Sequence, residues 1–128
     1  MSNFIFVFGS NLSGVHGAGA AKYAVDHYGA RMGQGIGLQG QSYAIPTKGH
    51  LIETLPIPLI LAHVGDFKDI AASYPSTIFR VTQIGCGLAG YTSEQIAPMF
   101  KSAPKNCQFD TSWKSWIGEN YTYWGNVK

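Results

Sequence analysis

The chain has 128 residues, of which 12% are charged, and its formal net charge is +2. That length fits one domain with a buried core. The near-neutral balance, without runs of Lys or Arg, excludes the basic surface expected of a protein that binds duplex nucleic acid. Cys86 and Cys107 are far apart and match no metal or redox spacing, so we expect two reduced thiols, no metal site and no cofactor.

Nothing in the sequence indicates a membrane partner. Its longest apolar stretch, residues 55–64, holds two prolines and a histidine and is too short to cross a bilayer. No basic region followed by a signal-like apolar core opens the chain. We therefore expect a soluble cytoplasmic protein, and the sequence leaves its oligomeric state open.

The organising element is the stretch from residue 4 to residue 28. Its first five residues are an uninterrupted apolar run, which predicts a buried strand of a parallel sheet. A glycine loop follows, and a helix is predicted over residues 17–28 from one apolar face at three- and four-residue spacing: Ala18, Ala21, Ala24, Val25 and Tyr28. Gly29 is a suitable C-terminal stop.

The middle of the chain predicts a loop, a strand and a second helix. Residues 30–40 are glycine-rich and are expected to be a loop, and residues 41–46 a short strand that ends at Pro46. A helix is expected to begin near Pro58, since proline suits a first helical turn. Its buried face would comprise Ile60, Val64, Phe67, Ala71 and Tyr74.

The second half begins with a strand over residues 77–84, which is rich in β-branched residues. A second glycine turn, residues 85–91, leads into a helix over 93–101, where Thr92 and Gln95 fit a capping box. A last strand is expected over 106–109. The aromatic segment 110–128 has no clear predicted structure.

Strands that alternate with helices predict a single α/β domain over residues 1–128, a three-layer α/β/α sandwich with a mostly parallel sheet. Both glycine turns follow strands, so both lie at carboxyl ends of strands, where open parallel sheets bind ligands. If the two strands are neighbours, the turns face one ligand. This convergence is the main functional signal.

Neither glycine turn matches a common nucleotide motif. The first lacks the Gly-Lys-Ser/Thr end of a phosphate loop, and its glycine spacing does not fit a dinucleotide-binding fingerprint. Kinase and nicotinamide-dehydrogenase functions are therefore disfavoured. What remains is a cradle of backbone N–H groups for phosphate or ribose. The alternative is that the glycines only relieve steric strain in tight turns.

Three segments resemble the macro-domain family, and they are most similar to its compact bacterial and phage members. Residues 9–21 resemble that family's first loop and the helix start that follows it. Residues 84–91 resemble its second loop, with Ile-Gly-x-Gly ending in Gly and an aromatic residue. Residues 42–49 resemble a short strand that ends in Thr.

The resemblance implies a macro-like fold and an ADP-ribose-type ligand. The second loop would hold the diphosphate, the first the distal ribose, and Tyr91 would cover that ribose. The family's adenine-contacting Asp lies on an earlier strand that this sequence lacks, which leaves the base open. Trp113 and Trp116 are candidates to line the adenine edge in its place. The ligand-binding residues implied are Gly9, Ser10, Asn11, Gly17, Ala18, Gly19, Ala20, Thr47, Gly85, Cys86, Gly87, Leu88, Ala89, Gly90 and Tyr91.

Three side chains could do chemistry in these loops, each with a plainer alternative. Asn11 could orient a ribose or a water, or only stabilise a turn. His16 could act as a general base, since it titrates near neutral pH, or make only structural or solvent contacts. Cys86 could be a nucleophile, but no His accompanies it locally. Asn11 and His16 are therefore the catalytic candidates.

Three functions remain open. The first is binding of an ADP-ribose-type nucleotide that is free, cyclic or attached to a macromolecule, in a phage setting as a way to sequester a nucleotide signal. The second is a hydrolase that removes or processes ADP-ribose derivatives. The third is a protein-interaction module that uses the aromatic C-terminal segment.

Overall fold

Strand β1 (Phe4–Asn11) is the centre of the sheet in the computed structural model, which describes residues 4–127. It pairs in parallel with β3 (Ser42–Lys48) on one side and with β4 (Ile78–Val81) on the other. The short β2 (Gly37–Gln39) runs antiparallel to β3. The parallel strands β5 (Cys107–Asp110) and β6 (Thr122–Gly125) complete the order β2-β3-β1-β4-β5-β6.

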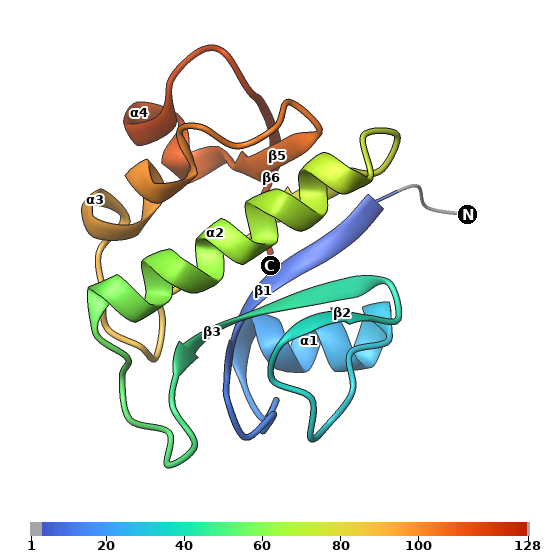
Figure 1. Ribbon diagram of the computed structural model, residues 1–128, viewed down its shortest axis with the longest axis vertical. Coiled ribbons are helices and arrows are strands. Elements are labelled where there is room, and N and C mark those ends of the chain that lie inside the picture. The colour runs from blue at the N-terminus through green and yellow to red at the C-terminus, as the bar shows by residue number, and fades with distance from the viewer. Residues whose placement is uncertain (1–3, 128) are drawn as a thin grey trace.

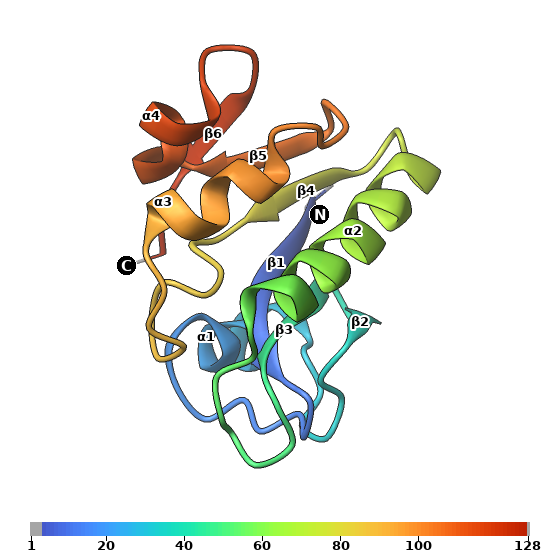
Figure 2. The ribbon, with the colours of Figure 1, turned by 60° about the vertical axis from the view of Figure 1, so that its left-hand side comes forward.

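Helices cover both faces of this sheet (Figure 1). Helix α1 (Gly19–Tyr28) lies on one face. Helices α2 (Ile57–Ser73), α3 (Ser93–Ile96) and α4 (Lys114–Ile117) lie on the other, as the turned view also shows (Figure 2). The expected α/β class with a mostly parallel sheet is confirmed, and the layers are compatible with an α/β/α sandwich. Within residues 4–127, no helix is both long enough and apolar enough to span a membrane.

The apolar run of β1 supplies both halves of the core. Phe6 and Phe8 pack with Ala21 and Ala24 of α1, whereas Val7 belongs to the larger cluster under α2. Successive side chains of a strand point to opposite faces, so a strand covered on both sides reads as continuously apolar. The sequence signal and the central position of β1 therefore have the same cause.

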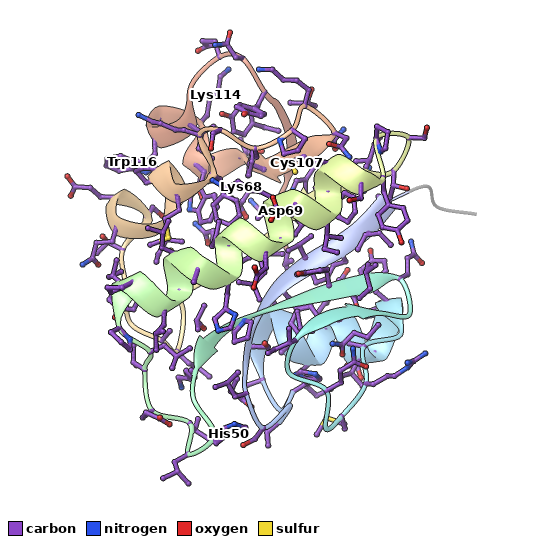
Figure 3. All side chains as sticks on the ribbon, in the orientation of Figure 1. His50, Lys68, Asp69, Cys107, Lys114 and Trp116 are labelled. Atoms are coloured by element: carbon purple, nitrogen blue, oxygen red, sulfur yellow. The ribbon has the colours of Figure 1, made fainter. Side chains whose placement is uncertain are left out.

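Helix α2 buries the predicted face, with one exception. Ile60, Val64, Phe67 and Ala71 are fully buried, but Tyr74 is 49% exposed because the helix has ended before it. Lys68 of this helix, labelled in Figure 3, donates a hydrogen bond to the Met99 carbonyl at 2.9 Å. This bond ties the helix to the segment that follows α3.

Three predicted boundaries in the first half were wrong. The strand expected to end at Phe8 continues to Asn11. The first helix begins at Gly19 rather than residue 17, and the strand expected to stop at Pro46 continues to Lys48. Strand β2 pairs only with residues 42–44 of β3, so that side of β3 has no partner strand at Pro46. A proline is tolerated there because its missing N–H leaves no ladder bond unmade. Residues 30–40, which were expected to form only a loop, also contain the strand β2.

The second half follows the predicted order with shorter elements. The expected strand 77–84 is regular only over Ile78–Val81. The capping box of Thr92 and Gln95 is present, but α3 ends at Ile96 and continues as a 3₁₀ helix, Ala97–Phe100. Pro98 has no N–H with which to continue the α-helical ladder.

The C-terminal aromatic segment is part of the fold. A 3₁₀ helix, Thr111–Trp113, leads into α4, and the chain returns as β6 beside β5. The indole Nε1 of Trp124 donates to the Val81 carbonyl at 2.9 Å, which ties β6 across β5 to β4.

Phe67 provides a test of the core. Its ring contacts those of Tyr43, Phe79 and Phe100, so Phe67→Ala should lower the free energy of unfolding by about 3–5 kcal/mol. Leu61→Ala, on the same helix but 48% exposed, should cost less than about 1 kcal/mol. Urea denaturation of both variants measures the difference; equal losses would contradict this description of the core.

Candidate functional site

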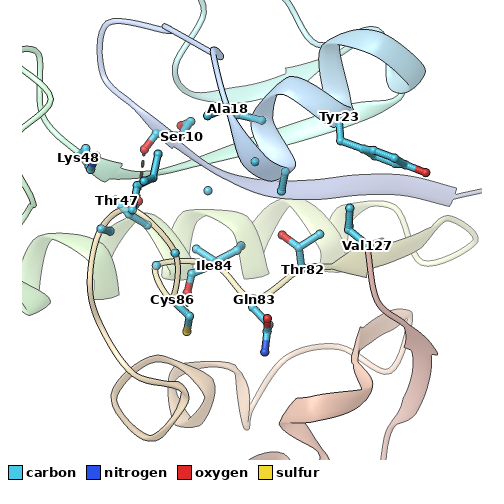
Figure 4. A pocket seen from close by; sticks show the side chains of 18 of the residues that line it. Ser10, Ala18, Tyr23, Thr47, Lys48, Thr82, Gln83, Ile84, Cys86 and Val127 are labelled. Atoms are coloured by element: carbon cyan, nitrogen blue, oxygen red, sulfur yellow. Dashed lines mark hydrogen bonds between the residues drawn. The ribbon is translucent and has the colours of Figure 1, made fainter.

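One cavity of about 840 Å³ lies at the carboxyl ends of β1, β3, β4 and β5 (Figure 4). Both glycine turns line it. Because β1 and β4 are neighbours, the turns begin side by side, and a Cβ atom on Gly9 would lie 3.5 Å from the Gly85 nitrogen. The expectation that the two turns face one site is confirmed.

The N-terminus of α1 opens onto this cavity without a cap. Residues 17–21 line the cavity wall, and the N-cap residue, Ala18, provides no side-chain hydrogen bond to the first turn. That turn also lacks an acidic residue. The first N–H groups of a helix have no partner within it, and together with the helix dipole they favour an anion.

The second turn offers further backbone donors. Its shape is fixed by the Tyr91 N–H, which donates to Gly85 O at 2.9 Å, and by the Gly90 N–H, which donates to Gly87 O at 3.0 Å. Within residues 4–127, no acceptor receives the N–H groups of Gly85, Gly87, Leu88 and Ala89. These four residues line the cavity together with Cys86. The turn therefore holds unused donors in a defined geometry.

Polar side chains at the base of the first loop form hydrogen bonds that stabilise the loop itself. The Asn11 amide donates to Val15 O at 2.8 Å and accepts from the Val15 N–H at 2.9 Å. The Ser10 hydroxyl donates to Gly35 O, and the Thr47 hydroxyl donates to Ser10 O at 3.3 Å. All three residues line the cavity. Of the two roles considered for Asn11, its hydrogen bonds show the stabilisation of a turn.

His16 and Tyr91 do not line the cavity, nor does Gly90. The His16 ring is 2% exposed, packs edge-on against Phe8, and its Nε2 donates to Gln34 O at 2.9 Å. Tyr91 is turned the other way, since its hydroxyl donates to Leu55 O at 2.7 Å. The structure therefore places the expected general base and the expected ribose cover outside the site.

Cys86 lines the cavity as a neutral thiol. Burial raises the pKa of the Cys86 thiol, and its sulfur lies 3.9 Å from the Ser93 hydroxyl oxygen. No histidine is among the described cavity-lining residues. Because the thiolate is the nucleophilic form, this environment does not activate the cysteine.

Several cavity residues carry no recognisable sequence motif. Lys48 is the single Lys or Arg among the described lining residues. Residues from the ends of β4, β5 and β6 also contribute: Thr82, Gln83, Asp110, Ser112, Asn126 and Val127. Among residues 4–127 no group of three or more His, Cys, Asp or Glu side chains could hold a metal ion. The signal that could have found this set was the position of each residue at a strand end.

The two tryptophans proposed for an adenine edge lie elsewhere. Trp113 is fully buried, and its Nε1 donates to the Ser93 hydroxyl at 3.1 Å. Trp116 is 39% exposed; it is labelled in Figure 3 near α4 and lies outside the cavity lining. The aromatic ring that does reach the cavity is Tyr23, from α1.

Two glycines of the first loop should differ in their response to substitution. Gly14 has φ +72°, and an added Cβ would lie 2.4 Å from the Gln34 nitrogen, whereas a Cβ on Gly17 would meet nothing within 4 Å. Gly14→Ala should therefore cost about 2 kcal/mol or more in the free energy of unfolding. Gly17→Ala should change it by less than about 0.5 kcal/mol. Thermal denaturation compares them, and a stable Gly14→Ala variant would contradict the close approach.

Comparison with known proteins identifies no relative of this chain: no family model, no curated protein and no solved structure matches it. The chemistry of the cavity is therefore inferred from its own residues.

Proposed function

We propose that the protein binds an ADP-ribose-type nucleotide, free, cyclic or attached to a macromolecule, in the cavity between its two glycine turns. The observation that carries the proposal is the pair of backbone donor groups, from α1 and from residues 85–89, that meet at one cavity. The resemblance of both turns to macro-domain loops supports the same ligand class. Sequestering a nucleotide signal is one use that such binding would serve.

The size of the cavity supports a ligand as large as a nucleotide. About 840 Å³ lies within the range of roughly 300–1,000 Å³ found for small-molecule and cofactor sites. The site also combines an apolar wall with a few polar groups, which is the usual composition of such pockets.

Backbone donors rather than charged side chains would hold the diphosphate. Each charge-assisted hydrogen bond contributes roughly 1.5–3 kcal/mol, so two or three unused N–H groups suffice for a measurable affinity. Lys48, at the same cavity, adds one positive charge. The uncapped α1 N-terminus would supply an anion site next to the first turn. This site is additional to the diphosphate site expected at the second glycine turn.

Binding is better supported than hydrolysis. A hydrolase needs a group that positions or deprotonates water close to the ligand. The Asn11 amide is occupied by Val15, and His16 lies outside the cavity lining. The two residues first considered for catalysis therefore provide no such group.

Gly87→Glu tests the diphosphate site. A Cβ on Gly87 would meet nothing within 4 Å, so the fold should tolerate the change, while the carboxylate would project among the unused donors. Titration calorimetry with ADP-ribose, AMP and NAD should show binding of ADP-ribose to the unaltered protein. We expect affinity about 100-fold lower or worse in Gly87→Glu, equivalent to losing roughly 3 kcal/mol.

The matched control is Gly65→Glu, on α2 and outside the cavity, where an added Cβ also meets nothing within 4 Å. It introduces the same side chain and should bind normally. Absence of ADP-ribose binding at millimolar ligand would refute the proposed function. Normal affinity for ADP-ribose in a folded Gly87→Glu variant would show that the second turn is not part of the binding site.

Lys48→Met tests the one basic side chain at the cavity. Loss of a partly exposed charge should weaken ADP-ribose binding about threefold to tenfold, since such a pair contributes about 1 kcal/mol. The salt dependence of the affinity should also decrease. Lys22→Met, which removes an exposed lysine paired with Asp26, is the control. An unchanged affinity and salt response in Lys48→Met would show that the ammonium group does not reach the ligand.

A further inference from the structure

The end of the cavity beside β5 and β6 contains a buried carboxylate that the proposed function does not use. Asp110 is the last residue of β5, is 3% exposed and lines the cavity. A carboxylate in a buried position is normally paired or fully hydrogen-bonded, because loss of hydration is costly. Where its two oxygens find partners therefore indicates what the position is for.

Only one of the two oxygens is satisfied. Asp110 Oδ1 accepts from the Ser112 N–H at 2.9 Å and from the Ser112 hydroxyl at 2.7 Å. The Ser112 hydroxyl in turn accepts from the Gln83 amide. Among residues 4–127 the structure gives Oδ2 no hydrogen-bond partner, and Oδ2 is not one of the unpartnered atoms that are completely enclosed. Because Asp110 lines the cavity, Oδ2 opens onto it.

The surroundings of Asp110 suit a flat ring. Asp110 pairs in register with Gly125 of β6, so Asn126 and Val127, which also line the cavity, follow directly beside it. Val127 packs against the same apolar cluster as Tyr23, and both are labelled along the same side of the cavity in Figure 4. An apolar side chain, Val127, and an aromatic one, Tyr23, thus line the same cavity as the free carboxylate oxygen.

The charge of Asp110 decides which part of a ligand can lie there. A carboxylate is acceptor-only and repels phosphate, so this end is unsuited to the diphosphate. A ring that presents an N–H₂ group satisfies Oδ2, whereas a ring that presents a carbonyl oxygen would face it with a second acceptor. Leaving a buried acceptor unpaired is costly, which is how polar sites discriminate between related ligands.

We propose that Asp110 Oδ2 accepts a hydrogen bond from the exocyclic amine of the ligand's base, so that the cavity selects an amino-bearing base over its carbonyl analogue. This inference rests on the proposed nucleotide binding. It assigns a contact to the base, the part of the ligand that the glycine turns leave unspecified. Tyr23 and Val127 contact the ring, and Ser112 with Gln83 holds the carboxylate in place.

Asp110→Asn tests this assignment because it exchanges an acceptor for a donor. The Ser112 N–H is a fixed donor, so the amide oxygen of the substituted side chain takes the Oδ1 position and preserves the turn. The amide nitrogen must then face the cavity, where it repels an amine and can donate to a carbonyl oxygen. The fold is kept while the preference for the base should change.

The probes are ADP-ribose and inosine diphosphate ribose; in the second a carbonyl replaces the exocyclic amine and the adjacent ring nitrogen carries a hydrogen. Calorimetry should show that the unaltered protein prefers ADP-ribose by about tenfold to 100-fold, the usual discrimination of a base-edge contact. In Asp110→Asn the preference should disappear or invert. Asp69→Asn, an exposed carboxylate of α2 outside the cavity lining, should retain it.

Each outcome decides something different. If the unaltered protein binds both probes equally, or if Asp110→Asn leaves their ratio unchanged, the assignment of Asp110 is wrong and nucleotide binding stands. If neither probe binds at millimolar concentration, the proposed function fails and this inference fails with it. Loss of both affinities in Asp110→Asn by the same factor would assign Asp110 a purely structural role and overturn the proposal.

Discussion

The parallel pairing of β1 with both β3 and β4 is the constraint on which the cavity depends. Parallel neighbours end at the same edge of a sheet, so the loop after β1 and the turn after β4 meet there without any long-range signal of their own. The two segments are direct neighbours, since a Cβ atom on Gly9 would lie in ordinary contact, 3.5 Å, with the Gly85 nitrogen. Burial of β1 on both faces fixes its central place, and through that place it fixes the site.

The cavity lining combines groups of opposite electrostatic character. Unused backbone N–H groups and the α1 N-terminus favour an anion, with Lys48 as the one basic side chain among the described lining residues. The carboxylate of Asp110 lines the same cavity. A ligand that is anionic along its whole length would be repelled by that carboxylate, whereas a molecule that joins a phosphate to a donor-bearing ring matches both kinds of group.

The sequence predicts this fold well where local and tertiary signals agree. The apolar run of β1, the buried face of α2 and the capping box at Thr92 follow from residue spacing and are present. Strands β2 and β6 were not predicted, because residues 37–39 lie in a glycine-rich stretch that indicates a loop and the aromatic segment that holds β6 has no clear pattern. For His16 the sequence left two roles open, and the structural one is observed; Tyr91 was expected to cover a ribose and packs elsewhere. Sequence places a residue in a loop but does not determine on which side of that loop its ring packs.

The use of side chains in the first loop bears on where the proposed site could discriminate between ligands. The side chains of Asn11, Ser10 and Thr47 each form hydrogen bonds to backbone groups in or beside the loop. The His16 ring likewise donates to the Gln34 carbonyl. These bonds set the loop's shape, so the proposed ligand would be held there by N–H groups, which nearly every residue type supplies. Backbone donors recognise an oxygen-rich anion and cannot distinguish one base from another. Discrimination therefore needs side chains with unused polar atoms, and in the described cavity lining Asp110 supplies a buried one.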